Sequence, residues 1–230
     1  MQKTVLITGA NGNLGTAVVK KFLEEQYRVV AVDRTDDHLQ FAKGNPAFEW
    51  YNVNLTDEKI TQDFIHTIIK KCTTIDAALL LVGGFAMGKL EQTDGASIKK
   101  MFTLNFDTAF YPARLLFQHM LQKEYGRIVF VGARPALKPS QGKNMVAYSL
   151  SKSLLFSLAS MMNEEAIGKN VAASVIVPST IDTPANRESM QKANPADWVS
   201  AEQIADTLLM ICSEKGLPLR EMVYKLYNNA

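Results

Sequence analysis

The sequence contains little cysteine and little histidine. Its 230 residues include two cysteines, Cys72 and Cys212, which share no Cys-x-x-Cys spacing with each other or with a histidine. This usage excludes a disulfide framework and favours free buried thiols in a reducing compartment. The three histidines, His38, His66 and His119, have no metal-ligand spacing and lie in predicted helical segments, where we expect them to be solvated. The sequence therefore predicts no metal site.

Long hydrophobic runs and an excess of one charge are also absent. The longest apolar stretch, Ala77 to Met87, is far too short to span a bilayer. The first residues lack the apolar region and the cleavage site of a signal peptide. Lys and Arg number 25 against 23 Asp and Glu, a net charge of +2, which gives no basis for binding nucleic acid or an acidic lipid surface. We therefore expect a soluble cytoplasmic protein that binds neither.

Short apolar runs alternate with longer helical patterns along the whole chain. The runs are nearly continuous, as in parallel strands that are covered on both faces. Strands are predicted at Thr4–Thr8, Arg28–Asp33, Phe48–Val53, Ala77–Val82, Arg127–Gly132, Val171–Val177 and Met222–Leu226. Helices are predicted at Asn13–Gln26, Asp57–Lys71, Gly95–Lys123 and Met145–Gly168, and more weakly at Thr35–Lys43.

This alternation predicts an α/β fold, a Rossmann-type doubly wound parallel sheet of about seven strands with helices on both faces. The chain has no low-complexity linker or internal repeat at which a second domain could begin. Residues 1–230 are therefore expected to form a single domain. The stretch Pro178–Pro195, richer in Pro, Ser, Thr and Asn, is expected to be a mobile excursion over the carboxyl edge of the sheet.

A glycine-rich turn joins the first predicted strand to the helix that follows it. One glycine lets the chain reverse, another lets the backbone approach a pyrophosphate, and the last lets helix and strand pack closely. The N–H groups at the start of the helix then point at the phosphates. In the first turn of a βαβ chain this pattern predicts a dinucleotide site, and a tight turn without a ligand is the alternative. The candidate residues are Gly9, Asn11, Gly12, Asn13, Leu14 and Gly15.

An acidic residue closes the second predicted strand. Asp33 follows the last glycine of the turn by about 18 residues. A carboxylate there accepts hydrogen bonds from both adenosine ribose hydroxyls and repels a 2′-phosphate. Arg34 follows directly and offers a partner for that phosphate. The sequence therefore favours NAD(H) and leaves NADP(H) open.

Tyr148 and Lys152 are spaced i and i+4, which places them on one face of a predicted helix. Such a pair arises by chance too often to carry an argument alone. Here it opens the helix after the fifth strand, downstream of the glycine-rich turn. Together these features resemble the short-chain dehydrogenase/reductase family, and the resemblance covers the whole chain.

The resemblance implies a role for several further residues. Asn105, in Leu104-Asn105-Phe106, matches the family's helix asparagine that holds a proton-relay water. Lys152 would hold the nicotinamide ribose and lower the pKa of Tyr148. Oligomers are usual in the family, so a homodimer or homotetramer is implied, with an entirely intramolecular core as the alternative. Further cofactor contacts are implied for Asn54, Leu55, Gly83, Gly84, Pro178, Ile181 and Thr183.

Within this family, three segments are similar to the dihydropteridine reductase branch, which uses NADH to reduce quinonoid dihydropterins. They are Gly83–Gly88, Gly132–Leu137 and Ile181–Arg187. That branch also lacks the family's usual serine after the fifth strand, where this chain has Ala133. Phe85 replaces the tryptophan expected to flank the pterin. The resemblance thus implies substrate contacts at Phe85, Ala133 and Met145.

Three functions remain open at this point. The first is hydride transfer to a quinonoid dihydropterin with Tyr148 as the proton donor. A ketone concentrates negative charge on one oxygen that a serine would stabilise, whereas a conjugated pterin spreads that charge, so Ala133 is tolerable. The second is another carbonyl or alcohol substrate, and the third is a catalytically weak dinucleotide-sensing protein. The presence of Tyr148, Lys152 and Asn105 argues against the third.

Overall fold

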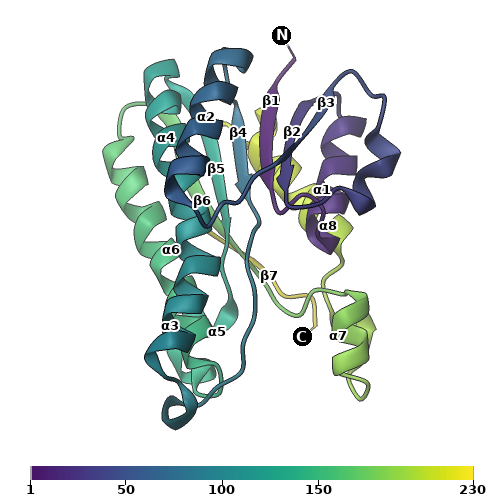
Figure 1. Cartoon of the computed structure of the whole chain (residues 1–230), viewed down its shortest axis with the longest axis vertical. Helices are drawn as coiled ribbons and strands as arrows, with labels where there is room; N and C mark the ends of the chain where they lie inside the picture. The colour runs from purple at the N-terminus through teal and green to yellow at the C-terminus, as the bar shows by residue number, and fades with distance from the viewer. Residues whose placement is uncertain (1, 230) are drawn as a thin grey trace.

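The computed structural model describes residues 2–229, whose strands form one seven-stranded sheet in the order β3-β2-β1-β4-β5-β6-β7 (Figure 1). Every neighbouring pair is parallel. The predicted doubly wound sheet is therefore confirmed. The strands are β1 (Thr4–Thr8), β2 (Arg28–Asp33), β3 (Phe48–Asn52), β4 (Ala77–Leu80), β5 (Tyr125–Val131), β6 (Asn170–Pro178) and β7 (Val223–Leu226).

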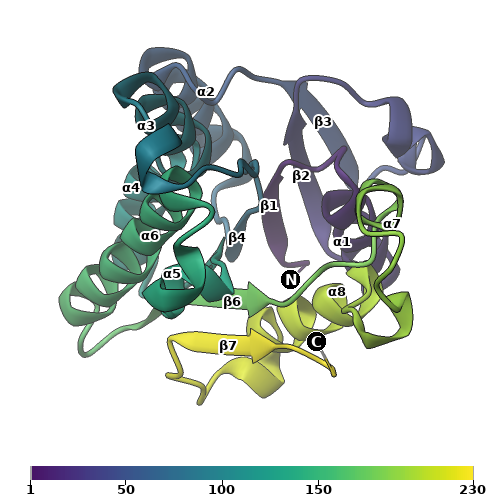
Figure 2. The ribbon, with the colours of Figure 1, turned by 90° about the horizontal axis from the view of Figure 1, so that it is seen from below.

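Helices cover both faces of the sheet (Figure 2). One face carries α1 (Asn13–Glu24) and α8 (Ala201–Cys212), and the other carries α2 (Glu58–Cys72), α4 (Thr108–Lys123) and α6 (Val146–Glu165). None of the helices in the described part of the chain is long and apolar enough to cross a membrane.

Successive strand residues feed two separate cores, because side chains alternate between the faces of a sheet. In β1, Val5 and Ile7 pack toward α1 and α8, while Leu6 packs toward α2, α4 and α6. All three are fully buried. This double burial explains why the strands read as unbroken apolar runs.

Helix α8 has no counterpart among the predicted elements, although the sequence carries its signal. The Ser200 hydroxyl accepts a hydrogen bond from the Gln203 N–H, and the Gln203 side chain accepts one from the Ser200 N–H. This reciprocal capping box starts the helix. Ile204 and Leu208 then lie on one face, one turn apart, and are fully buried.

The single helix predicted over Gly95–Lys123 is wrong in its middle. It consists of α3 (Gly95–Phe102), a π-helical turn over Thr103–Asp107, and α4. The turn coincides with Asn105, whose side chain is fully buried and hydrogen-bonded to other elements. Such one-turn π segments occur mostly at functional sites.

Two other segments also differ from expectation. The weakly predicted helix Thr35–Lys43 is a 3₁₀ helix, η1 (Asp37–Ala42). The stretch expected to be a mobile excursion, Pro178–Pro195, contains the helix α7 (Pro184–Ser189), which Thr183 caps through its hydroxyl oxygen. It lies at the carboxyl edge as predicted (Figure 1).

The histidine prediction is wrong at one position, whereas the cysteine prediction is confirmed. His119 on α4 is 6 % exposed, and its Nε2 atom finds no hydrogen-bond partner among residues 2–229. Burial lowers the pKa of His119, because the charged imidazolium is poorly solvated there. Cys72 and Cys212 are both free and buried.

A polar cluster stabilises the edge strand β3. The Glu49 carboxylate accepts hydrogen bonds from Arg28, Tyr51 and Lys71. Burial alone would raise the pKa of Glu49, but the hydrogen bonds from Lys71, Tyr51 and Arg28 outweigh it and lower the pKa to about 2. In the unfolded chain the pKa of a glutamate is about 4.3. The cluster therefore stabilises the fold above that pH, and this contribution is lost as the pH falls toward 2.

We expect Glu49→Gln to lower the free energy of unfolding at pH 7 by on the order of 1 kcal/mol, since the cluster is partly exposed and screened by solvent. The difference between variant and parent should shrink between about pH 4.5 and pH 2, where the parent carboxylate becomes protonated. Urea unfolding at several pH values measures it. A difference that does not change with pH would contradict the assigned role of the charge.

Candidate active site

The predicted site residues gather at the carboxyl edge of the sheet, the lower edge in Figure 1. The strand order reverses between β1 and β4, and ligands of open α/β sheets bind at such a switch point. Each strand but β7 contributes a residue or turn at its end or within three residues of it: Gly9–Gly15, Asp33, Asn54, Gly83, Ala133 and Pro178.

The glycine-rich turn is closed so tightly that it leaves no room for side chains at two positions. Gly9 has φ +67°, a left-handed conformation that favours glycine. A Cβ on Gly15 would lie 2.0 Å from the carbonyl oxygen of Gly9. The helix α1 starts at Gly12 without a side-chain cap and has no acidic residue in its first turn. Its first N–H groups are therefore oriented to bind an anion.

Asp33 is bound directly to this turn. Its Oδ2 atom accepts the Asn11 backbone N–H at 2.8 Å, and its Oδ1 atom accepts the Arg34 backbone N–H at 2.7 Å. Asn11 and Asp33, which are far apart in sequence, are thus in direct contact at the end of β2. The Arg34 side chain is exposed beside them.

Three of the predicted cofactor residues have side chains that are already engaged. Leu55 is 5 % exposed and belongs to one core cluster, and Leu14 packs against the other. The Asn54 Oδ1 atom accepts hydrogen bonds from the N–H and the hydroxyl of Thr56. The backbone of these residues, more than their side chains, is therefore free for contacts at the carboxyl edge of the sheet.

Tyr148 and Lys152 lie one turn apart at the start of α6. Lys152 is 4 % exposed, and its Nζ atom donates to the carbonyl oxygen of Val131 at 2.8 Å. The Tyr148 ring meets the Phe85 ring edge to face, with centroids 5.1 Å apart. Burial raises the pKa of Tyr148 to about 12 and lowers that of Lys152 to about 8. With Nζ on Val131, the structure does not show the expected lowering of the Tyr148 pKa by Lys152.

Asn105 joins three elements of the site through its side chain. Its Oδ1 atom accepts the Gly84 N–H at 2.9 Å, and its Nδ2 atom donates to the Ser151 hydroxyl at 3.0 Å. Ser151 in turn donates to the carbonyl oxygen of Tyr148 at 2.8 Å. The loop after β4, the π turn and the start of α6 are thus linked by one chain of hydrogen bonds. The sequence analysis missed Ser151, although a polar residue beside Lys152 on a buried face is a signal for it.

Gly83 leaves space for the Asn105 side chain and the Lys152 ammonium group to lie close together. A Cβ there would lie 2.8 Å from Asn105 Oδ1 and 2.9 Å from Lys152 Nζ. The absent side chain thus lets both polar groups approach the end of β4.

Apolar side chains flank Tyr148 on its solvent side. Phe85 is 60 % exposed, and Met145 lies on a loop that pairs with the loop carrying Phe85. The pairing runs from the Gly88 N–H to the Asn144 carbonyl at 2.7 Å. Ala133 is buried and directly precedes α5 (Arg134–Leu137). Of the three predicted substrate residues, Phe85 contacts Tyr148 directly, Met145 lies on the loop paired with that of Phe85, and Ala133 is buried after β5.

The segment after β6 forms a further part of the site at the carboxyl edge. Pro178 ends β6 and is buried, and Ile181 forms a parallel bridge with Val199. The Thr183 hydroxyl oxygen accepts the Asn186 N–H at 3.2 Å. These three residues lie at the carboxyl edge, as the resemblance implies.

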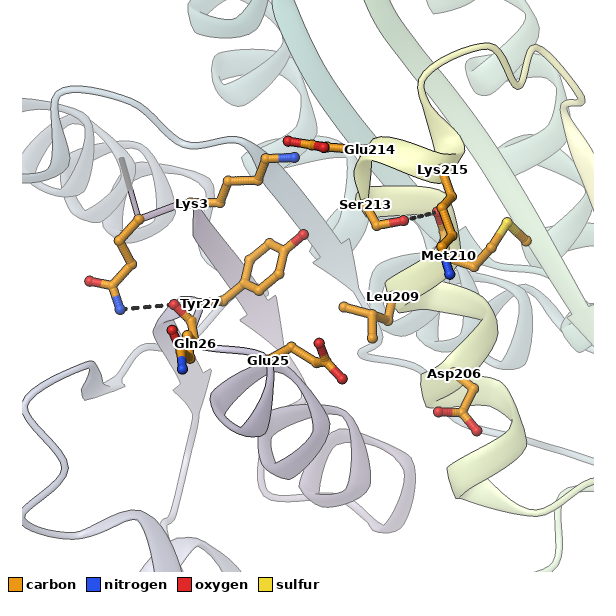
Figure 3. A pocket seen from close by; sticks show the side chains of 11 residues that line it. Lys3, Glu25, Gln26, Tyr27, Asp206, Leu209, Met210, Ser213, Glu214 and Lys215 are labelled. Carbon is orange, nitrogen blue, oxygen red and sulfur yellow. Dashed lines mark hydrogen bonds between the residues drawn. The ribbon is translucent and has the colours of Figure 1, made fainter.

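A separate surface hollow lies at the opposite, amino edge of the sheet (Figure 3). Its lining includes Lys3, Tyr27, Asp206 and Glu214, from the start of β1 and the ends of α1 and α8. Both signs of charge are present, and none of the predicted site residues takes part. In the described part of the chain, no group of three or more His, Cys, Asp or Glu side chains could hold a metal ion.

Comparison with known proteins points to one family. The family model of short chain dehydrogenases matches residues 3–194. Dihydropteridine reductase of Dictyostelium discoideum is 28 % identical over 211 residues, which cover 90 % of this chain and 87 % of that protein. A 3-oxoacyl-(acyl-carrier-protein) reductase of Buchnera aphidicola is 24 % identical and covers 94 % of this chain and 91 % of its own length.

Solved structures agree on the fold. ElxO with NADP bound superposes with a TM-score of 0.88 at 20 % identity, covering 98 % of this chain and 97 % of its own. NAD⁺-bound xylitol dehydrogenase superposes with a TM-score of 0.86 at 18 % identity, covering 98 % of both chains.

Two of the three glycines of the turn, Gly12 and Gly15, should respond differently to a methyl group. In Gly15→Ala the new Cβ meets backbone atoms of Gly9 and Ala10 at 2.0 and 2.7 Å, so we expect a loss of several kcal/mol in the free energy of unfolding. In the control Gly12→Ala the nearest atom is 3.3 Å away, and we expect a loss below about 1 kcal/mol. Chemical unfolding measures both, and equal losses would contradict the close packing of Gly15.

Proposed function

Because the chain belongs to the short chain dehydrogenase family, a family of nicotinamide-dependent oxidoreductases, we propose that it reduces a quinonoid dihydropterin-like substrate with Tyr148 as proton donor. The observation that carries this proposal is Ala133, buried just after β5 where the family's usual serine would stand, together with the aromatic pair of Phe85 and Tyr148. An oxyanion would find no hydroxyl at Ala133, while a flat conjugated ring would find an apolar surface. The similarity to a dihydropteridine reductase supports the same substrate class.

The residues at the carboxyl edge fit a nicotinamide dinucleotide, which supplies the hydride. The uncapped start of α1 after Gly12 suits a pyrophosphate, Asp33 suits the adenosine ribose, and Lys152 suits the nicotinamide ribose. The charge of Asp33 makes NAD(H) the preferred cofactor, with NADP(H) as the weaker one. The further contacts proposed are Gly9, Asn11, Asn13, Leu14, Gly15, Arg34, Asn54, Leu55, Gly83, Gly84, Pro178, Ile181 and Thr183.

In its buried state Tyr148 holds a proton at neutral pH, and it needs a nearby positive charge to release that proton. Its raised pKa, about 12, keeps the phenol protonated at neutral pH. Once the proton has left, the phenolate needs a nearby positive charge, and Lys152 lies one turn away on α6. Asn105 and Ser151 fix the backbone around Tyr148, so the donor is held in place.

The same machinery would also serve another carbonyl substrate, and one observation favours keeping this alternative. The 3-oxoacyl reductase of Buchnera aphidicola, which by its name acts on a ketone, covers as much of the chain as the dihydropteridine reductase does. A catalytically weak dinucleotide-sensing protein is the further alternative. Activity with a pterin and a ketone separates all three.

We further propose that two or four copies of the chain assemble through α4 and α6. Helix α4 carries half-buried apolar side chains such as Phe110 and Leu115, and α6 carries exposed ones. Met161 is 68 % exposed and Leu150 is 48 % exposed. Burying such side chains against a second copy would be favourable.

NADH oxidation with quinonoid dihydropterin is the direct test. We expect turnover to exceed that with simple ketones, and kcat/KM with NADH to exceed that with NADPH. Tyr148→Phe should lower kcat roughly 10²- to 10⁴-fold, because it removes the proton donor, and should leave NADH binding unchanged. Efficient ketone reduction without pterin reduction would refute the substrate class, and a fully active Tyr148→Phe would refute the donor.

Adding the missing hydroxyl tests the charge argument itself. Ala133→Ser introduces one donor where a ketone oxyanion would form. A native donor of this kind contributes about 2.7–4 kcal/mol to the transition state, and a grafted one should contribute less. We expect kcat/KM for ketones to rise and that for the pterin to stay level or fall, since Ala133 is buried. A parallel rise for both substrates would contradict the argument.

A further inference from the structure

We infer that His38 is a positioning residue for cofactor selection, which holds Asn11 and Asp33 in an arrangement that accepts a ribose diol and denies hydrogen bonds to a 2′-phosphate. The inference rests on the proposed preference for NAD(H) and adds the device that maintains it. The loop after β2 and the glycine-rich turn meet at this point.

All four polar groups of Asn11 are bound to the last residue of β2 and to the segment after it. Its backbone N–H donates to Asp33 Oδ2 at 2.8 Å, and its side-chain Nδ2 donates to the Thr35 hydroxyl at 2.7 Å. Its side-chain Oδ1 accepts the His38 backbone N–H at 2.8 Å. Its carbonyl oxygen lies 2.9 Å from His38 Nδ1. Because a carbonyl oxygen only accepts, Nδ1 carries the hydrogen in that contact.

His38 is held by the structure around it. It lies in the 3₁₀ helix η1, and its neighbour Leu39 is 1 % exposed in the core that α1 and α8 cover. The ring itself is exposed. The buried Leu39 side chain fixes this helix in place, so that the exposed His38 ring can contact Asn11 without being part of the hydrophobic core.

The consequence for a bound nucleotide follows from the donors. A phosphate is bound by N–H groups and cations, but the backbone N–H of Asn11 and one of its two side-chain N–H hydrogens already donate to Asp33 and Thr35. The Asp33 carboxylate, fixed by the Asn11 and Arg34 backbone N–H groups, adds a negative charge at the same place. If the contact from the His38 ring to the Asn11 carbonyl oxygen is lost, the Asn11 backbone can shift and offer its N–H groups, together with the Arg34 side chain, to a 2′-phosphate.

A purely structural role of His38 leads to a different expectation. Its removal would weaken the binding of NADH and of NADPH alike, because both cofactors share the pyrophosphate and the nicotinamide half. The ratio of the two dissociation constants therefore separates selection from general support.

The experiment measures Kd for NADH and for NADPH by cofactor fluorescence, without any substrate. His38→Ala should weaken NADH binding roughly three- to tenfold, the effect of about one hydrogen bond. NADPH binding should stay level or tighten, so the ratio falls. His38→Asn, whose amide can donate from nearly the position of Nδ1, should restore most of the ratio. His66→Ala, at an exposed histidine on α2 across the sheet, is the matched control and should change neither.

Equal weakening of both cofactors, or no recovery in His38→Asn, would overturn the inference. If His38→Ala does not fold, Thr35→Val tests the same arrangement of Asn11 through another contact, because it removes the acceptor of Asn11 Nδ2 at an exposed position. Its ratio should fall in the same direction. Parent protein that binds NADPH better would refute the cofactor preference itself. A failed pterin assay would leave the test intact, because it needs no substrate.

Discussion

The contact between Gly15 and the carbonyl oxygen of Gly9 sets the geometry on which the rest of the site depends. It brings the first turn of α1 directly against the end of β1, closer than any side chain allows. The helix therefore starts with its free N–H groups at the switch point of the sheet. Asn11 lies inside this turn, and so its bonds to Asp33, Thr35 and His38 depend on the same closure.

The sequence predicted the elements that have a regular apolar pattern, and it missed the features that depend on single long-range contacts. All seven strands were predicted, with ends shifted by no more than two residues, as at β4, because double burial leaves an unmistakable apolar run. The break at Thr103–Asp107 was missed, because Asn105 is drawn inward by Gly84 and Ser151, which are distant in sequence. His119 was expected in solvent for a similar reason, since nothing local indicates that its side of α4 is covered.

At the proposed reactive centre, too, the sequence predicted the local arrangement and missed what depends on the surrounding fold. The spacing of Tyr148 and Lys152 predicted that both lie on one side of a helix, and they do. Their protonation could not be predicted, because it follows from burial, which raises the pKa of Tyr148 and lowers that of Lys152. The lysine contact with Val131 likewise depends on where β5 ends. The sequence motif identifies the titratable side chains, whereas the surrounding fold determines whether they are protonated.

The two buried cysteines have a chemical consequence of their own. Burial raises the pKa of both thiols, that of Cys212 to about 12. The thiolate is the nucleophile in sulfur chemistry, so both cysteines of the chain are poor nucleophiles. Thiolates exposed on a protein surface add to electrophilic rings and become alkylated. Because Cys72 and Cys212 are buried and stay protonated, both are protected from such electrophiles.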